Sequence, residues 1–209
     1  MKVTQYITTA NQNFNSVELK RAVRMSGALT VVPAEKPLNT SFKGFGVAIT
    51  GASCYNLSEM TNEARTALIN DIYSPEGLNL SVARFSVGSS DYSAELYSYD
   101  DVDGDVELKY FSIDRDKEYI IPMIKEILKV RPDLYIYSSP WSPPGWMKTG
   151  GSICGGYMRE EFVDCYAEYY VNSLRLMKLK ASISAPLLPR TRPKHIRAAE
   201  CLPAYGIPR

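Results

Sequence analysis

The chain has 209 residues, of which 45% are hydrophobic and 22% are charged, and its formal net charge at pH 7 is +1. This composition is typical of a globular protein, and the length suits one large domain or two small ones. The nearly balanced charge argues against nucleic acid and anionic membrane surfaces as partners.

The first residues are polar. Met1-Lys2 is followed by "VTQYITTANQN", which lacks the apolar core of a signal peptide. No apolar run approaches the roughly 18 residues that a membrane-spanning helix needs. We therefore expect no membrane span and a cytoplasmic location.

Two short, β-branched segments come before residue 42. "VTQYIT" and "LTVVP" (Leu29 to Pro33) are bounded by turn residues and predict strands. They precede the alternating strands and helices described next. We therefore expect residues 1–41 to form a separate β element.

Three strands and three helices then alternate. Strands are predicted at Phe45 to Thr50, which would end in a loop, at Leu80 to Phe85, and in "DLYIYSS". Helices are predicted in "LSEMTNEARTALINDIYSPEGL", with Thr61 as N-cap, in "EYIIPMIKEILKVRP" and in "REEFVDCYAEYYVNSL". The acidic "YDDVDGDVELKYF" predicts a solvated loop.

Apolar residues recur at helical spacing within each predicted helix. This pattern predicts core faces, and we interpret the aromatic residues of the third helix as packing residues, not ligand contacts. The expected faces are Ala64, Leu68, Ile69 and Ile72, then Ile120, Ile121, Ile124, Ile127 and Leu128, then Phe162, Tyr166, Tyr169 and Tyr170.

The alternation of strands and helices predicts an α/β fold with a parallel sheet. Loops rich in unusual residues follow the carboxyl ends of the strands, and in a (β/α)8 barrel that end carries the active site. In "GFGVAIT" two glycines flank Phe45 and suggest close backbone approach at a tight turn. Arg84 ends the second strand, and Asp91 follows seven residues later. An arginine in a buried strand needs partners, so the pair is equally consistent with a structural ion pair and a substrate clamp.

"SSPWSPPGWMKTGG" follows the third strand and holds both tryptophans of the chain, Trp141 and Trp146. Pro143 and Pro144 exclude helix and regular sheet, so this loop is rigid and irregular. An indole beside hydroxyl groups suits a sugar, whose C–H face stacks on the ring. The alternative is that both rings only plug the top of the barrel. The four cysteines form no CxxC pair and no Cys/His cluster at zinc spacing, so we expect no metal site.

Four motifs, "GFGVAIT", "ARFSVGSSDYS", "YIYSSPWSPPGWMKTGG" and "GGYMREEFVDCYAEYYV", resemble glycoside hydrolase family 30, the glucosylceramidase-type enzymes. The resemblance covers roughly Phe42 to Leu174. It implies a (β/α)8 TIM barrel with a β-sandwich side domain, retaining hydrolysis of β-glycosides by two glutamates, and no cofactor. It also implies that Arg84, Asp91 and Trp141 line the subsite of the glycone sugar. Gly51 departs from the family, because many relatives carry an acid there.

Composition changes at Arg175. Residues 1–174 hold 16 Lys and Arg against 22 Asp and Glu, a balance of −6, whereas residues 175–209 hold 8 against one acid, a balance of +7. The second segment lacks a hydrophobic period and a parallel strand. The family places one catalytic glutamate in an Asn-Glu pair, and no such pair follows Trp141. We therefore expect residues 42–174 to be the N-terminal part of the barrel, about three β/α units, with both catalytic glutamates absent.

We interpret this change as the result of a shifted reading frame. New codons built from the last base of one codon and the first two of the next permit "AYEAEGIxISAVTPQNETETxQSGRMPACLWHPE" from Arg175 onward. This string supplies a fourth strand that ends in "QNE". We therefore expect residues 175–209 to be an out-of-frame, disordered tail. The alternative is a genuine basic extension.

The predicted parent function is retaining β-glycoside hydrolysis of glucosylceramide type on a carbohydrate or glycolipid substrate, with the chain itself inactive. A xylan-directed enzyme of the same family is one alternative. A non-catalytic sugar-binding fragment that uses Trp141 is another.

Overall fold

The computed structural model describes residues 3–19, 35–36, 39–181 and 188–189. The chain divides into two compact units, with the boundary in the sequence between Ser41 and Phe42. The strand predicted at Leu29 to Pro33 lies outside the described residues. Each unit is described by itself.

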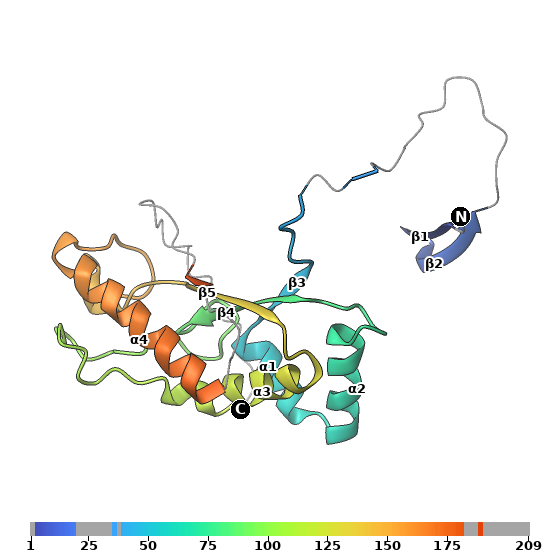
Figure 1. The fold of residues 1–209 in the computed structure, drawn as a ribbon. Coiled ribbons are helices and arrows are strands. Elements are labelled where there is room, and N and C mark those ends of the chain that lie inside the picture. Colours follow the sequence, from blue (N-terminus) through green and yellow to red (C-terminus); the bar gives the residue numbers. More distant parts are fainter. Residues whose placement is uncertain (1–2, 20–34, 37–38, 182–187, 190–209) are drawn as a thin grey trace, which may run out of the picture. The chain divides into compact units, whose positions relative to one another are not determined.

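The first unit contains an antiparallel hairpin of β1 (Val3–Thr9) and β2 (Gln12–Leu19) (Figure 1). β1 was predicted and β2 was not, because asparagine and serine in "QNFNSVEL" weaken its β pattern. The rings of Tyr6 and Phe14 stack on the hairpin with centroids 5.1 Å apart. This contact between rings from both strands helps to fix the pairing.

The second unit is built on a parallel sheet in the order β3–β4–β5–β6 (Figure 1). Its strands are β3 (Gly46–Ile49), β4 (Val82–Val87), β5 (Tyr135–Pro140) and β6 (Leu188–Pro189). Its helices are α1 (Gly51–Glu59), α2 (Asn62–Tyr73), α3 (Ile120–Val130) and α4 (Val163–Ala181), with 3-10 turns η1 (Asp114–Lys117), η2 (Gly145–Met147) and η3 (Glu160–Phe162). The three predicted strand–helix units are confirmed.

Two elements differ from the predictions. A loop was expected after Thr50, but α1 begins there, because the Thr50 side chain accepts a hydrogen bond from Ser53 N and caps the helix. A parallel strand was not expected after Arg175, yet Leu188 pairs with Tyr137 of β5, so that expectation is wrong. Pairing with β6 satisfies backbone groups at an otherwise open sheet edge.

The described helices lie to one side of the sheet (Figure 1). Ala83, Phe85 and Ile136 are buried on that side, and Tyr170 Oη of α4 donates to Ser138 O there over 2.6 Å. Between these positions, Arg84 of β4 and Tyr135, Tyr137 and Ser139 of β5 are half-buried, whereas Ser86 is buried. We call their side, which carries Arg84 and Tyr137 in register, the open face of the sheet.

The predicted core faces are largely confirmed. In α3, Ile120, Ile121, Ile124 and Ile127 are buried, and Tyr169 and Tyr170 of α4 join the same core. In α2, Thr61 caps the helix as predicted and Ile69 is buried. The buried face includes Tyr73 instead, and Ala64 and Leu68 are exposed, so the prediction is wrong for these two residues. Among the described helices, none is both long and apolar enough to cross a membrane.

The two glycines around Phe45 serve close approach, as predicted. A Cβ added at Gly46 would lie 1.9 Å from Val82 O, so a side chain there would force β3 away from β4. Gly44 has a φ of 109°, which L side chains rarely adopt. These glycines therefore set the start of the sheet.

Candidate functional site

The parallel strands β3, β4 and β5 end at the same edge of the sheet. In register, Ala48 of β3 lies beside Arg84 of β4, which lies beside Tyr137 of β5. The segments that follow these strands carry Gly51, Asp91 and Trp141. This edge therefore gathers the residues that the sequence singled out.

Arg84 was expected at the end of its strand, but β4 continues to Val87, so Arg84 lies within the strand, where it is half-buried on the open face. Its Nε donates to Ser139 Oγ over 2.8 Å, and its Nη2 donates to Ser139 O over 3.3 Å. Both acceptors are neutral, and together they engage two of the five N–H donors that a guanidinium carries. Toward the described part of the chain the remaining donors make no hydrogen bond, so they can meet a polar ligand at the open face.

Asp91 lies in a turn after β4 and is exposed. Within the described residues it forms no ion pair with Arg84, so the structural ion pair considered above is not formed. The turn is held by its own serines: Ser90 N donates to Ser93 Oγ over 3.0 Å, and Tyr92 N donates to Ser90 Oγ over 3.2 Å. The structure does not bring Asp91 into contact with Arg84.

Gly51 lets this turn approach α1. Ala52 N donates to Tyr92 O over 2.9 Å, and a Cβ at Gly51 would lie 3.3 Å from Ser93 Oγ. An acidic side chain in place of Gly51 would press against the turn that carries Asp91. The absence of a side chain at Gly51 therefore leaves room for the turn that carries Asp91.

The two tryptophans have different environments. Trp141 directly follows β5 and is half-buried. Trp146 is only 7% exposed, donates from its indole Nε1 to Asp100 O over 3.1 Å, and packs edge-on against Phe162 with centroids 5.0 Å apart. Trp146 therefore packs into the interior and supports the loop, whereas Trp141 remains partly exposed.

Lys148 is a buried residue of the same loop that sequence reasoning missed. It is 3% exposed, and its Nζ donates to Ser142 Oγ over 2.9 Å and to Ile153 O over 2.6 Å. Burial lowers the pKa of its ammonium below the usual range. The sequence offered no signal, because a lysine in a polar loop is normally solvated.

A buried carboxylate anchors the segment between β4 and α3. Asp116 is fully buried and accepts hydrogen bonds from the hydroxyls of Tyr97 (2.6 Å) and Tyr99. Burial raises the pKa of Asp116 to about 6, and the two tyrosine hydrogen bonds partly offset this effect. Tyr97 in turn brackets Ser89 through hydrogen bonds of its backbone N and O. Asp116 thus holds the loop that leads to Asp91.

The prediction of a solvated acidic loop is wrong in part. Tyr99 and Asp100 are 2% and 1% exposed, because Tyr99 stacks on Tyr169 and its backbone N donates to the Tyr169 hydroxyl over 2.9 Å. Asp101 and Asp103 are exposed, as predicted. Aromatic residues at the start of the segment were the signal that could have revealed this burial.

Carboxylates are missing from the strands of the site. None of the residues of β3, β4 or β5 is aspartate or glutamate. Over the described ranges, no group of three or more His, Cys, Asp or Glu residues could hold a metal ion. The described site therefore offers a cation, hydroxyls and an indole, a set suited to binding a neutral polyhydroxyl ligand.

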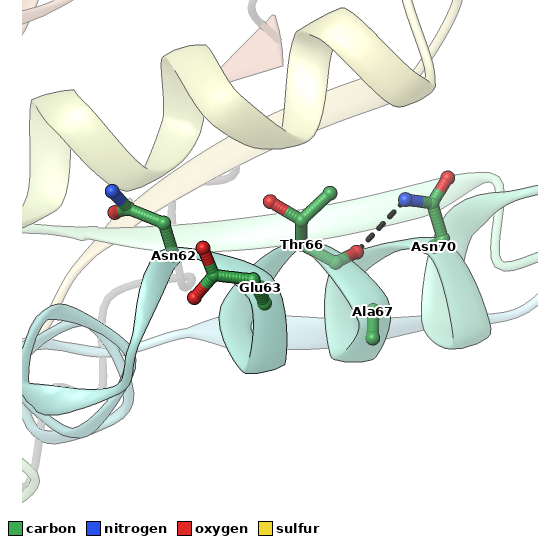
Figure 2. A pocket seen from close by; sticks show the side chains of 5 residues that line it. All are labelled: Asn62, Glu63, Thr66, Ala67 and Asn70. Atoms are coloured by element: carbon green, nitrogen blue, oxygen red, sulfur yellow. Dashed lines mark hydrogen bonds between the residues drawn. The ribbon is translucent and has the colours of Figure 1, made fainter.

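A hollow along α2 is lined by residues of a different kind from those of the site. Figure 2 shows that Asn62, Glu63, Thr66, Ala67 and Asn70 of α2 line it, and Asn70 Nδ2 donates to Thr66 O over 2.8 Å. A single helix supplies all these residues, and none of them is aromatic or cationic. This hollow lacks the convergent groups of a ligand site.

The chain matches known proteins over most of its length. The glycosyl hydrolase family 30 TIM-barrel domain matches residues 42–182. An endo-1,6-beta-D-glucanase of Neurospora crassa is 29% identical over 92% of this chain and 43% of that protein. The lysosomal acid glucosylceramidase of Mus musculus is 31% identical over 71% of this chain and 30% of that protein.

Solved structures of related chains give similar matches. An endo-beta1,6-glucanase matches 78% of this chain and 38% of its own, with a TM-score of 0.67 and 31% identity. SrfJ from Salmonella typhimurium matches 66% of this chain and 32% of its own, with a TM-score of 0.64 and 28% identity. The chain thus spans less than half the length of each of these relatives. The second unit is an incomplete (β/α)8 barrel, as predicted.

Proposed function

The chain belongs to glycosyl hydrolase family 30, and on that premise we propose that its open face is the glycone-binding part of a retaining β-glycosidase of glucosylceramidase type. One observation carries the proposal. Arg84 of β4 is half-buried on the open face, and Trp141 directly follows the neighbouring parallel strand β5 at its carboxyl end. In barrel enzymes of this architecture, catalytic and binding groups stand at that end.

The chemistry of these groups suits a neutral sugar. The half-buried indole of Trp141 offers an apolar surface for the C–H face of a glucose ring. The free N–H donors of Arg84 suit the hydroxyl oxygens at the ring edge, and the exposed Asp91 carboxylate would accept from another hydroxyl. A few polar groups around one aromatic platform are typical of such sites.

The catalytic carboxylates belong elsewhere in this proposal. Retaining hydrolysis needs two carboxyl groups about 5 Å apart, and the described strands of the site carry none. We place the acid/base glutamate in the shifted reading frame after Arg175. The sharp charge change and the hidden "QNE" support this placement. A break in the helix does not, because α4 continues to Ala181.

The substrate class has a second candidate. Glucosylceramide presents a single β-linked glucose, and the mouse relative is named for acting on it. The Neurospora relative and a solved neighbour are named endo-1,6-beta-glucanases, and these matches favour a β-1,6-linked glucan as the alternative. Both substrates place a β-glucosyl ring over Trp141. Xylan as the substrate and a purely sugar-binding role are the remaining alternatives, and the cytoplasmic location stays a prediction.

The test compares binding and hydrolysis. The chain is titrated calorimetrically with methyl β-glucoside and with a β-1,6-linked glucose disaccharide, and is incubated with an aryl β-glucoside. We expect saturable binding that requires Trp141, with hydrolysis at background. General acid catalysis alone typically contributes 10²–10⁴-fold, so even partial catalysis would be visible. Turnover that is abolished by changing a carboxylate of this chain would show that the glutamates are misplaced, and absence of binding would overturn the proposed site.

A further inference from the structure

Lys148 keeps an ammonium inside the loop after β5 with only neutral partners. Its side chain is 3% exposed, and within the described residues it forms no ion pair. Its two acceptors are Ser142 Oγ at 2.9 Å and Ile153 O at 2.6 Å. Burial of a cation costs free energy unless hydrogen bonds compensate it. The two acceptors are therefore the groups through which Lys148 acts on the loop.

The three groups form a closed triangle. Ser142 Oγ also lies 2.7 Å from Ile153 O, so the hydroxyl accepts from Lys148 and donates to the same carbonyl. The triangle joins three distant points of the loop. The backbone adds to it, since Lys148 N donates to Gly145 O over 3.0 Å and Lys148 forms a β-bridge with Met158. The Lys148 ammonium therefore links separate parts of the loop through its hydrogen bonds.

Trp141 is linked to this triangle through its peptide bond to Ser142. Over the described residues, its own side chain makes no hydrogen bond and no ring contact. Its backbone is held on one side by Pro140, which is in register with Val87 of β4. On the other side it is held by Ser142, whose hydroxyl belongs to the triangle. Release of Ser142 would free one of the two supports of the indole.

We propose that Lys148 is a positioning residue, which fixes the Trp141 indole for sugar binding by holding Ser142 in place. The inference rests on the proposed function, in which Trp141 is the sugar platform. Lys148 itself touches no substrate. Its effect on sugar binding passes through the hydroxyl of Ser142 and one peptide unit.

The test observes each tryptophan separately. The full chain is labelled with 5-fluorotryptophan, and because it has two tryptophans, ¹⁹F NMR gives two resonances. Loss of one in Trp141→Phe assigns them. Lys148→Met removes the ammonium at similar side-chain length, and Ser142→Ala removes the connecting hydroxyl while it keeps the Lys148 to Ile153 bond. Lys125→Met, on the exposed side of α3, is the matched control.

We expect the Trp141 resonance to shift or broaden in both Lys148→Met and Ser142→Ala, while the Trp146 resonance keeps its place. The dissociation constant of methyl β-glucoside should rise about tenfold in both variants. Lys125→Met should change neither resonance nor affinity. If Lys148→Met fails to fold, Ser142→Ala decides the question alone.

The outcomes separate this inference from the proposed function. If the Trp141 resonance stays unchanged in Ser142→Ala, or if both resonances move together, Lys148 has only a general structural role and the inference fails. Equal sugar affinity in all variants also overturns it. If the resonance moves but the parent chain binds no sugar, the positioning stands and the proposed function fails.

Discussion

Arg84 Nε donates to Ser139 Oγ over 2.8 Å, and the bond joins β4 to β5 on the open face. Ser139 lies two residues before Trp141, so one cation fixes the strand end from which the indole projects. Hydrogen bonds that involve a charged group typically contribute about 1.5–3 kcal/mol. A bond between neighbouring strands in this place therefore couples the strand ends of the proposed site.

Replacement of Arg84 by lysine tests this role. Lysine keeps the charge but lacks the planar fork that reaches two acceptors. We expect Arg84→Lys to raise the dissociation constant of methyl β-glucoside at least about tenfold, measured by isothermal titration calorimetry. Arg65→Lys is the control, because Arg65 forms its ion pair with Glu126. Unchanged affinity in Arg84→Lys would remove Arg84 from the site.

The reading frame after Arg175 makes a prediction at the level of the gene. In the shifted frame, asparagine requires an Arg190 codon that ends in A, and glutamate requires ACG for Thr191 followed by an AG-type codon for Arg192. We expect the source DNA to carry AAC GAG across these codons. Sequencing of the region checks it directly. Arg190, Thr191 and Arg192 codons that cannot yield asparagine and then glutamate would exclude the frame shift.

The raised pKa of Asp116 lets us predict how the free energy of unfolding varies with pH. Its folded-state pKa is about 6, raised chiefly by burial, against 3.8 in its unperturbed form. Between these values the folded state binds more protons than the unfolded state, so stability falls as pH rises from about 4 to 6. Two pKa units correspond to about 3 kcal/mol.

Asp116→Asn isolates this contribution. The amide does not titrate, so the variant should lack that part of the slope, whereas Asp100, whose pKa is also raised to about 6, contributes equally to both proteins. Urea unfolding at pH 4, 5, 6 and 7 gives the free energies of unfolding. Equal slopes for Asp116→Asn and the parent chain would mean that this carboxylate is not held in a raised state by its burial against Tyr97 and Tyr99.

Local patterns were sufficient to predict most elements of the second unit. The isoleucine spacing of α3, the Thr61 cap of α2 and the strand that precedes Trp141 all depend on neighbours within a few residues. α1 was missed because Thr50 caps a helix whose first residue is a glycine, which looks like a loop signal. Local chemistry at a helix start can therefore oppose the composition of the segment.

The pairing of the site residues could not be predicted. Ser139 is 55 positions from Arg84, and only the strand register brings them together. Asp91 was the partner that sequence proximity suggested, but its turn is closed by serines instead. Lys148 gave no signal, since its burial results from a loop that folds back on itself. Long-range register and loop closure are properties of the assembled fold.

Replacement of the two tryptophans tests the sugar-platform proposal most sharply. Both lie in one loop, and we predict opposite effects of the two replacements on binding and stability. Trp141→Ala should raise the dissociation constant of methyl β-glucoside at least about tenfold, roughly 1.4 kcal/mol, since the stacking surface is removed. Its melting temperature should stay nearly unchanged, because the ring is half-buried and packs against no other ring among the described residues. Trp146→Ala should instead cost roughly 3–5 kcal/mol of stability, because a buried ring leaves a cavity and Asp100 O loses its donor. Calorimetric titration and urea unfolding of both variants separate the two roles. If Trp141→Ala unfolds the chain while any folded fraction binds the glucoside normally, the ring is a plug of the barrel and not a sugar platform.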